Sequence, residues 1–303
     1  MRVLVTGGAG FIGSHTVDVL VEAGFRVAVL DNLSSGSMEN IKHPVNFYHG
    51  DITDRTFVSH CMKRENPEVV FHLAAQASVP VSLQDPAADA RVNIVGTLIL
   101  LEAARAENVR KVVFASSAAV YGFPEYLPVD ELHQIRPVSG YGLSKYAAER
   151  YLELYKTLYG LDYTVLRYAN VYGPRQNAGG EGGVVAIFTD RIARGEEPVI
   201  YGDGEQTRDF VHVLDVARAN VSAVHRGGGM TLNIGTGRPV TVNRLFEIVS
   251  GAAAYTRSPR YGQTRPGDIR DSSLDSRRAG EYLGWVPGIE LEQGINDMIG
   301  KTD

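Results

Sequence analysis

The sequence predicts an α/β protein built on a doubly wound parallel sheet, followed by a smaller C-terminal α/β domain. Short β-branched runs alternate with longer helical patterns through the first half of the chain. Several runs are apolar throughout, as expected for parallel strands that helices cover on both faces. From about Val171 the pattern changes to shorter elements with frequent Pro, Gly and Arg, which indicates a different architecture.

Six segments are expected to form the parallel sheet. They are Arg2–Thr6, Arg26–Leu30, Asn46–His49, Val69–Leu73, Lys111–Ser116 and Tyr163–Arg167. The helical patterns between them would supply the right-handed crossovers that parallel strands require. We expect a nucleotide-binding domain over residues 1–170 and a smaller substrate domain over 171–303. Because Asp209–Val224 again has the pattern of a strand and a helix, we expect the chain to return to the first domain around residues 209–224.

Composition excludes several functional classes. The 303 residues carry a net charge of −5 and one cysteine, Cys61, so no disulfide can form within the chain and a reducing, cytoplasmic location is expected. No run approaches the roughly 18 apolar residues of a membrane span, and no secretion signal is expected at the N-terminus. Lys and Arg are dispersed, which disfavours nucleic-acid binding. The eight histidines lack metal-ligand spacing, so no metal is expected.

A glycine-rich segment follows the first predicted strand. It reads Thr6-Gly7-Gly8-Ala9-Gly10-Phe11-Ile12-Gly13 and precedes a helical pattern that continues to about Ala23. Glycines there permit a tight turn and let backbone N–H groups approach a pyrophosphate. Asp31 ends the second strand, where a carboxylate can accept hydrogen bonds from an adenosine ribose and would repel a 2′-phosphate. The pattern therefore predicts an NAD site.

A second motif joins a tyrosine and a lysine on one helix face. Tyr141 and Lys145 are four residues apart at the start of a helical run that continues to about Tyr159. The ammonium would lower the phenol pKa, so that Tyr141 could act as a base near neutral pH. A chance pair on an exposed helix has the same spacing. Ser116-Ser117, at the end of the fifth strand, favours the functional interpretation because ligands bind at the carboxyl ends of such strands.

Taken together, these motifs resemble the extended short-chain dehydrogenase/reductase superfamily, which has a Rossmann fold. Further matching segments are Leu73-Ala74-Ala75, Ser116–Gly122, Arg167–Pro174 and Arg208–Val213. Within the superfamily the sequence is most similar to the UDP-glucose 4-epimerase branch of the NAD-dependent epimerase/dehydratase family. Dehydratases and decarboxylases of the superfamily carry an acidic residue where this chain has Ala118-Ala119, so the resemblance implies epimerisation.

The resemblance implies a role for each matching residue. Tyr141 would be the acid/base at the sugar 4-hydroxyl, with Ser117 as its partner and Lys145 bound to the nicotinamide ribose. Hydride would leave C4 for NAD, the 4-keto sugar would turn its other face, and the hydride would return. The residues implied in NAD binding are Gly7, Gly10, Phe11, Ile12, Gly13, Asp31, Asn32, Asp51, Ile52, Leu73, Ala74, Ala75, Tyr141, Lys145 and Tyr168.

The substrate side is implied to grip a UDP-sugar. The matching residues are Ser117, Asn170, Arg208, Arg265, Asp268 and Ser272, and guanidinium groups suit a pyrophosphate. An alternative for Arg208 is a surface ion pair with Asp209. Ser272 matches a position where many glucose-specific relatives carry a bulky aromatic, so we expect room for an N-acetyl group.

Three alternatives to a UDP-glucose-type 4-epimerase remain open from the sequence. These are a 4-epimerase of UDP-glucuronate or a related acidic sugar, a non-catalytic NAD-binding regulator, and a dehydrogenase with net redox turnover. Relatives form a homodimer through a four-helix bundle, and the stretches Leu98–Ala106 and Tyr146–Leu158 carry apolar residues at helical spacing. Core packing within one subunit would produce the same pattern.

Overall fold

A seven-stranded parallel sheet forms the centre of the computed structural model, which describes residues 1–179, 183–264 and 268–300. Its strands are β1 (Arg2–Thr6), β2 (Arg26–Asp31), β3 (Asn46–His49), β4 (Val69–His72), β5 (Lys111–Ser117), β6 (Asp162–Tyr168) and β10 (Met230–Ile234). They lie in the order β10-β6-β5-β4-β1-β2-β3. The strand order reverses between β1 and β4, which is where doubly wound sheets bind nucleotides.

The six strands predicted from the sequence are confirmed, with boundaries that differ by at most one residue. The seventh strand, β10, pairs with β6 from Met230↔Thr164 to Ile234↔Tyr168 and was not predicted. Side chains of the strands alternate between two cores, so that Val3 and Val5 lie in one cluster and Leu4 in the other. A period of two along a strand covered on both faces produces this arrangement.

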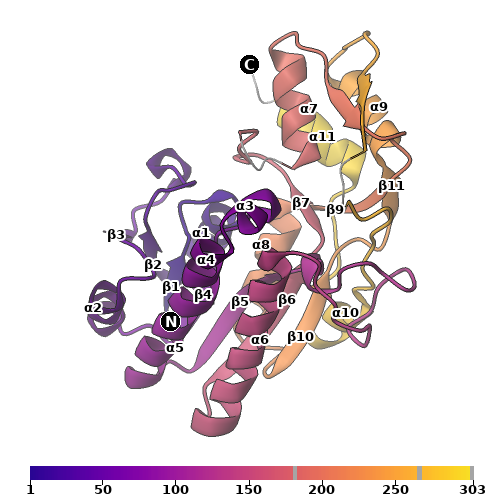
Figure 1. The fold of residues 1–303 in the computed structure, drawn as a ribbon. Coiled ribbons are helices and arrows are strands. Elements are labelled where there is room, and N and C mark those ends of the chain that lie inside the picture. The colour runs from indigo at the N-terminus through magenta and orange to yellow at the C-terminus, as the bar shows by residue number, and fades with distance from the viewer. Residues whose placement is uncertain (180–182, 265–267, 301–303) are drawn as a thin grey trace.

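Helices cover both faces of the large sheet (Figure 1). On one face lie α1 (Phe11–Glu22), α8 (Val213–Ser222) and α10 (Arg277–Leu283); on the other lie α2 (Arg55–Glu65), α5 (Thr97–Ala106) and α6 (Gly140–Tyr159). Between β4 and α5 the chain forms α3 (Val79–Gln84), α4 (Pro86–Ala90) and a π-helical turn, η2 (Arg91–Gly96). Two short 3-10 turns lie elsewhere in the chain, η1 (Met38–Asn40) and η3 (Ala118–Val120). The apolar side chains of these helices bury the strand residues on each face.

Two small sheets carry the remaining strands. One contains β7 (Asn170–Tyr172), β9 (Thr207–His212) and β11 (Pro239–Thr241), and the other contains β8 (Val199–Tyr201) and β12 (Arg260–Gly262). With α7 (Val184–Ala193), α9 (Val242–Ala252) and α11 (Leu291–Ile299) they build a separate apolar cluster around Phe188, Phe210 and Phe246. Figure 1 shows these helices grouped beyond one end of the large sheet.

The chain passes between the two regions more than once. Strand β9 belongs to a small sheet, whereas α8 directly after it packs against α1, and β10 then joins the large sheet. Helix α10 and Trp285 also pack into the cluster that contains α1 and α8. The division into residues 1–170 and 171–303 stays a prediction. In the described part of the chain, none of the helices is long and apolar enough to cross a membrane.

Candidate active site

The carboxyl ends of the parallel strands bring the predicted site residues to one edge of the large sheet. Asp31 ends β2, Ser117 ends β5 and Tyr168 ends β6, and all these strands run in the same direction. The glycine-rich turn follows β1 at the same edge. Residues separated by more than a hundred positions therefore lie around one site, as expected for an open α/β sheet.

The glycine-rich turn leads directly into helix α1. Gly10 is the residue before the helix and Phe11, with Ile12, opens its first turn, which has no side-chain cap. A Cβ atom on Gly13 would lie 1.9 Å from the Gly7 carbonyl oxygen, so only glycine allows the helix to start this close to the turn. Uncapped N–H groups at a helix start suit a pyrophosphate. The turn thus fits the predicted dinucleotide site.

Asp31 is buried beside this turn. Its Oδ2 atom accepts a hydrogen bond from Ala9 N at 2.9 Å, and its Oδ1 atom accepts one from Leu33 N at 2.8 Å. Each carboxylate oxygen can accept a second hydrogen bond, so both backbone bonds hold the carboxylate in place without exhausting its acceptors. This is the chemistry that a ribose diol requires.

Asn32 and Asp51 contact each other next to Asp31. Asn32 Nδ2 donates to Asp51 Oδ2 at 2.7 Å, and both Thr53 N and Thr53 Oγ1 donate to Asp51 Oδ1. Burial alone would raise the pKa of Asp51, but these hydrogen bonds outweigh it and the pKa is lowered. The carboxylate is therefore charged at neutral pH. The side chain of the neighbouring Ile52 is buried in the second core cluster.

Leu73, Ala74 and Ala75 follow β4 and are partly buried. Leu73 N donates to Thr6 O at 3.1 Å, which fixes this segment against the end of β1. Below it, His72 contacts Thr6 Oγ1 and Thr97 Oγ1 through its two ring nitrogens. Burial and the charge of Lys145 lower the pKa of His72 to about 3, so the ring is neutral at physiological pH.

Tyr141 and Lys145 lie on the first turns of α6, as predicted. Lys145 Nζ is 5.9 Å from the centroid of the Tyr141 ring and donates to Ala115 O at 2.9 Å. Burial lowers the pKa of Lys145 to about 8, although the carboxylates of Asp89 and Glu149 act to raise it. An ammonium this close to a phenol ring favours the phenolate electrostatically. The arrangement supports an acid/base role for Tyr141.

Ser117 is held close to this helix. Its Oγ atom accepts a hydrogen bond from Ala119 N at 3.1 Å. A Cβ atom on Gly142 would lie 2.4 Å from Ala119 O, so the start of α6 packs directly against the turn that follows Ser117. Ser117 and Tyr141 are thus brought together by two elements in contact.

A buried ion pair fastens α6 to the sheet below these groups. Arg167 donates to Glu149 through Nε at 3.0 Å and through Nη2 at 2.6 Å, and Ser116 Oγ donates to the same carboxylate. Glu149 was not predicted from the sequence, although its spacing of four from Lys145 places it on the same helix face. The pair fixes α6 against β5 and β6.

Tyr168 lies in the core cluster with its hydroxyl bonded to Asn220 Oδ1 at 2.6 Å. Burial raises its pKa, and the proximity of Tyr141 raises it further. Tyr168 therefore stays neutral near Tyr141. Its predicted contact with the cofactor stays a prediction.

On the substrate side, Arg208 does not pair with Asp209. Its guanidinium donates to Asp268 Oδ1 at 3.3 Å and to the carbonyl oxygens of Thr207 and Arg270. Asp209 is fully buried and accepts hydrogen bonds from residues 236, 237 and 274 instead. The alternative interpretation, a surface ion pair between Arg208 and Asp209, is therefore wrong. Arg208 and Asp268 instead form an ion pair with each other.

The structure describes two of the remaining predicted substrate residues, Asn170 and Ser272. Asn170 opens β7 and is exposed, paired in register with Phe210. Arg265 lies outside the described residues. Ser272 is partly buried in a segment held on both sides: Thr207 Oγ1 donates to Asp271 Oδ1 at 2.8 Å, and Val129 N donates to Ser273 O at 2.8 Å.

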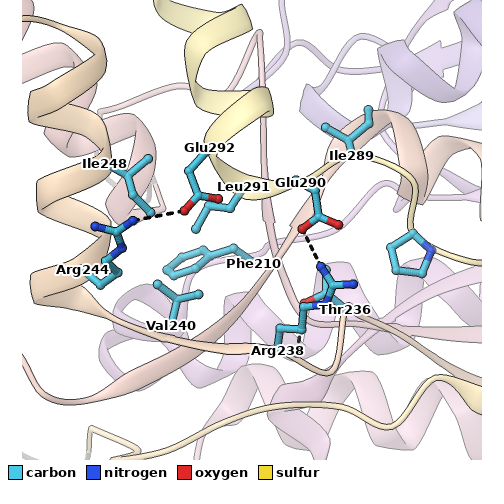
Figure 2. A pocket seen from close by; sticks show the side chains of 11 residues that line it. Phe210, Thr236, Arg238, Val240, Arg244, Ile248, Ile289, Glu290, Leu291 and Glu292 are labelled. Carbon is cyan, nitrogen blue, oxygen red and sulfur yellow. Dashed lines mark hydrogen bonds and ion pairs between the residues drawn. The ribbon is translucent and has the colours of Figure 1, made fainter.

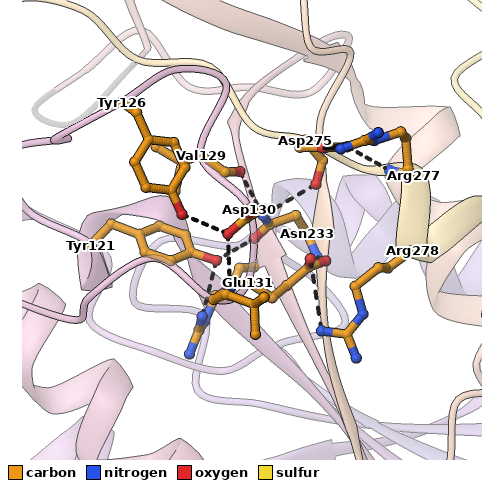
Figure 3. Close-up of polar contacts among 11 residues, drawn as sticks. Tyr121, Tyr126, Val129, Asp130, Glu131, Asn233, Asp275, Arg277 and Arg278 are labelled. Carbon is orange, nitrogen blue, oxygen red and sulfur yellow. Dashed lines mark hydrogen bonds and ion pairs between the residues drawn. The ribbon is translucent and has the colours of Figure 1, made fainter.

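A buried asparagine connects this segment to the large sheet. Asn233 of β10 donates to Val129 O at 2.9 Å and to Asp275 O at 3.3 Å, and accepts a hydrogen bond from the Tyr121 hydroxyl at 2.7 Å (Figure 3). Arg167, which binds Glu149, also donates to the Tyr121 hydroxyl. Hydrogen bonds therefore run from the catalytic helix to the segment next to Ser272.

A shallow pocket of about 180 Å³ lies elsewhere, between α9 and α11. Figure 2 shows Phe210 at its base, flanked by the ion pairs Arg238–Glu290 and Arg244–Glu292. None of the predicted site residues lines it. Because its guanidinium groups are already paired, we do not assign the active site to this pocket.

Comparisons with known proteins show the family of this chain. Residues 3–235 match the model of the NAD dependent epimerase/dehydratase family. The chain belongs to this family. A UDP-glucose 4-epimerase of Mycolicibacterium smegmatis is 47% identical, with 99% of this chain and 97% of the relative covered.

Solved structures of epimerases superpose closely on this epimerase/dehydratase family member. A Thermotoga maritima UDP-glucose 4-epimerase with UDP-glucose has a TM-score of 0.97 and 50% identity, covering 99% of this chain and 98% of that chain. A Methanobrevibacter ruminantium UDP-N-acetylglucosamine 4-epimerase, in complex with UDP-N-acetylmuramic acid, has a TM-score of 0.94 and 39% identity, covering 99% and 97%. The Rossmann fold predicted from the sequence is confirmed.

Proposed function

We propose that this protein is a UDP-sugar 4-epimerase that uses NAD. The observation that carries the proposal is the position of Tyr141 and Lys145 against Ser117 at the carboxyl edge of the sheet. At the same edge, the uncapped start of α1 and the Asp31 carboxylate fit the pyrophosphate and the adenosine ribose of the dinucleotide. Relatives that carry the name UDP-glucose 4-epimerase match nearly the full chain.

The chain's own residues would handle the proton at the sugar 4-hydroxyl. Tyr141 would remove this proton and later return it, while the Ser117 hydroxyl holds the same oxygen. Lys145 would hold a positive charge near the phenol and so favour the phenolate. NAD, when bound, supplies the acceptor and donor of hydride for C4. Gly7, Gly10 and Gly13 would hold its pyrophosphate, and Asp31 with Asn32 its adenosine ribose.

The turn after Ser117 favours epimerisation over elimination. Ala118 and Ala119 form this turn, η3, and neither can donate or accept a proton through its side chain. An elimination would need an acid or base close to the keto sugar. We infer that the sugar keeps its substituents and changes only the configuration at C4.

We propose that Ser272 contacts the sugar and that Arg208 contacts the diphosphate. The other residues proposed for substrate binding are Asn170, Arg265 and Asp268. Because serine is small, the substrate class would include N-acetylated UDP-hexoses as well as UDP-glucose and UDP-galactose. One neighbour of similar fold is a UDP-N-acetylglucosamine 4-epimerase, which supports this wider class. The smaller sheets and helices over residues 171–303 would form the sugar side, and residues 1–170 with the returning helix α8 the NAD side.

We also propose a cytoplasmic homodimer. Leu143, Leu154 and Leu158 on α6 are each more than two-fifths exposed, and a four-helix bundle would cover them. The apolar residues of α5 are largely buried in the chain's own core, so α6 would supply most of the interface. Sedimentation velocity of the Leu154→Glu, Leu158→Glu double variant tests this: a shift from dimer to monomer is expected, and an unchanged dimer would contradict it.

Proton NMR tests the function directly. Purified protein is mixed with equal UDP-galactose and UDP-N-acetylgalactosamine, and the anomeric signals of both 4-epimers are followed. Conversion of both is expected. Conversion of UDP-galactose alone would contradict the assignment of Ser272, and conversion of neither would overturn the proposal in favour of an acidic UDP-sugar, which UDP-glucuronate would then reveal.

Tyr141→Phe separates a catalyst from an NAD-binding regulator. If the protein is a catalyst, this substitution should lower the epimerisation rate about 1,000-fold while NAD stays bound. If it is an NAD-binding regulator, the wild type itself shows no epimerisation. Absorbance at the NADH band separates an epimerase from a dehydrogenase, because a dehydrogenase would release NADH with each turnover. Steady growth of this band under turnover would contradict the epimerase.

A further inference from the structure

A buried carboxylate, Asp89 of helix α4, is linked through Asn93 to helix α6, which carries Tyr141 and Lys145. Its side chain is 1% exposed. The hydrogen bonds that its Oδ1 atom accepts come from neutral amides, Gln76 Nε2 at 2.8 Å and Asn93 Nδ2 at 3.1 Å. Burying a carboxylate is costly unless a positive charge or several hydrogen bonds compensate. The position therefore calls for a cation nearby.

Lys145 is the cation on which Asp89 acts, although these two described side chains form no direct ion pair. Lys145 is 3% exposed, and its ammonium group donates to a backbone oxygen, Ala115 O. Two carboxylates act on it, and Asp89 has a larger effect than Glu149. The charge of Glu149 is already compensated by Arg167, which donates two hydrogen bonds to it. The charge of Asp89 thus remains as the main compensation for the buried ammonium.

The remaining groups around Lys145 carry no competing charge. His72 of β4 is neutral because its pKa is lowered to about 3. Phe114 of β5 presents its ring 4.9 Å from Lys145 Nζ, and the Tyr141 ring on α6 lies 5.9 Å away. Two carboxylates act on Lys145: Asp89 of α4, which accepts hydrogen bonds from amides, and Glu149 of α6, which pairs with Arg167. The other groups are the neutral imidazole of His72 and the rings of Phe114 and Tyr141.

Asn93 connects Asp89 through hydrogen bonds to helix α6, which carries Tyr141 and Lys145. It lies in the π-helical turn η2 and its Nδ2 atom donates to Ser144 Oγ at 3.0 Å as well as to Asp89. Ser144 is next to Lys145, and its Oγ donates to Tyr141 O at 3.1 Å. Gln76 N donates to Asn93 Oδ1 at 2.9 Å, so the segment after β4 joins the same network. π-helical turns often mark functional sites.

We propose that Asp89 is a positioning residue of the epimerase reaction, the counter-charge that keeps Lys145 an ammonium and, through Asn93, holds helix α6 in place beside the segment after β4. The proposal rests on the proposed function, because the reaction needs the ammonium beside Tyr141. An exposed aspartate of the same short segment offers a matched control. Asp85, one helical turn before Asp89, caps α4 through its contact with Ala88 N.

The first test measures Lys145 itself and needs no substrate. The chain has only six lysines, so NMR of the NAD-loaded protein labelled at lysine Cε resolves few signals, and Lys145→Arg assigns the one required. In Asp89→Asn we expect the titration midpoint of Lys145 to fall by about one pH unit. Asp85→Asn should leave it unchanged. Lys111, at the far end of β5, serves as an internal reference in every variant.

The second test measures the epimerisation rate against pH. The ammonium is lost as pH rises through the Lys145 midpoint, near pH 8, so a lower midpoint moves the alkaline fall of kcat to lower pH. For a shift of one unit, Asp89→Asn should match the wild type at pH 6 and be about eightfold slower at pH 8.5. A purely structural defect would lower the rate by the same factor at every pH.

An unchanged Lys145 midpoint in Asp89→Asn would overturn the proposal, whatever the activity. If this variant does not fold, Asp89→Ser removes the same charge and leaves space for a water molecule, with the same expected shift. A shifted midpoint in a protein that epimerises no UDP-sugar would leave the counter-charge intact and refute the proposed function instead.

Discussion

The Asp31 carboxylate accepts a hydrogen bond from the Ala9 amide, 22 positions earlier in the chain, at 2.9 Å. The end of β2 and the glycine-rich turn after β1 are therefore one unit. The acid that would read the adenosine ribose also fixes the turn that would hold the pyrophosphate. A change at Asp31 should affect both functions.

Asp31→Asn should weaken NAD binding about tenfold, because charge-assisted hydrogen bonds become neutral ones. Binding of NADP should weaken less, since the repulsion of a 2′-phosphate is removed. Calorimetric titration with both dinucleotides measures this, with the exposed Asp54→Asn as the control. An unchanged ratio of the two affinities would show that Asp31 does not face the ribose.

Gly13→Ala should destabilise the protein by about 1–3 kcal/mol, because the new methyl group would meet the Gly7 carbonyl oxygen. NAD affinity should fall with it, as the start of α1 must shift. Gly251→Ala is the matched control: it lies in helix α9 with open space around it, so about 0.5–1 kcal/mol of stabilisation is expected. Urea denaturation measures both, and equal effects of the two substitutions would refute the tight turn.

Ser272→Tyr should reduce kcat/KM for UDP-N-acetylgalactosamine about 100-fold, because the larger ring would occupy the space proposed for the acetamido group. The value for UDP-galactose should change much less and serves as the internal control. Coupled assays of both substrates decide the matter. An equal loss for both would place Ser272 away from the C2 substituent.

Lys111 should make stability depend on pH. Its side chain is 1% exposed, and burial lowers its pKa to about 8 from 10.5. Between these values the unfolded chain binds more protons, so stability rises with pH in this window. Relative to Lys111→Met, the wild type should gain about 2 kcal/mol in unfolding free energy from pH 7.5 to pH 10.

The exposed Lys63→Met is the control for this prediction and should show no such gain. Denaturation at the two pH values measures the difference. A constant difference between wild type and Lys111→Met would mean that Lys111 stays charged in the folded protein throughout this range.

The sequence predicted strands β1 to β6 to within one residue, because most of them are buried on both faces and mainly apolar. The edge strand β3, Asn46–His49, is only partly buried. Strand β10 was missed because it carries a buried polar residue, Asn233, whose partners lie 40 to more than 100 positions away. No local pattern shows such contacts.

The site was predictable to a similar degree. Gly13, Asp31, Tyr141 and Lys145 stand in motifs whose spacing is local or tied to strand ends. Asp89 stands in no motif, and an aspartate in a short helix is usually exposed. Its tertiary contacts with Gln76 and Asn93 link it to helix α6.

The order of the strands along the chain limits where the protein can be truncated. Strand β10 completes the large sheet, yet the chain makes it only after β7, β8 and β9 of the small sheets. A fragment that stops at residue 170 would leave β6 as an open edge and α1 without α8, which exposes backbone and apolar surface to aggregation. The halves of this molecule are therefore interdependent parts of one gene product, and neither could be exchanged between proteins by a single crossover.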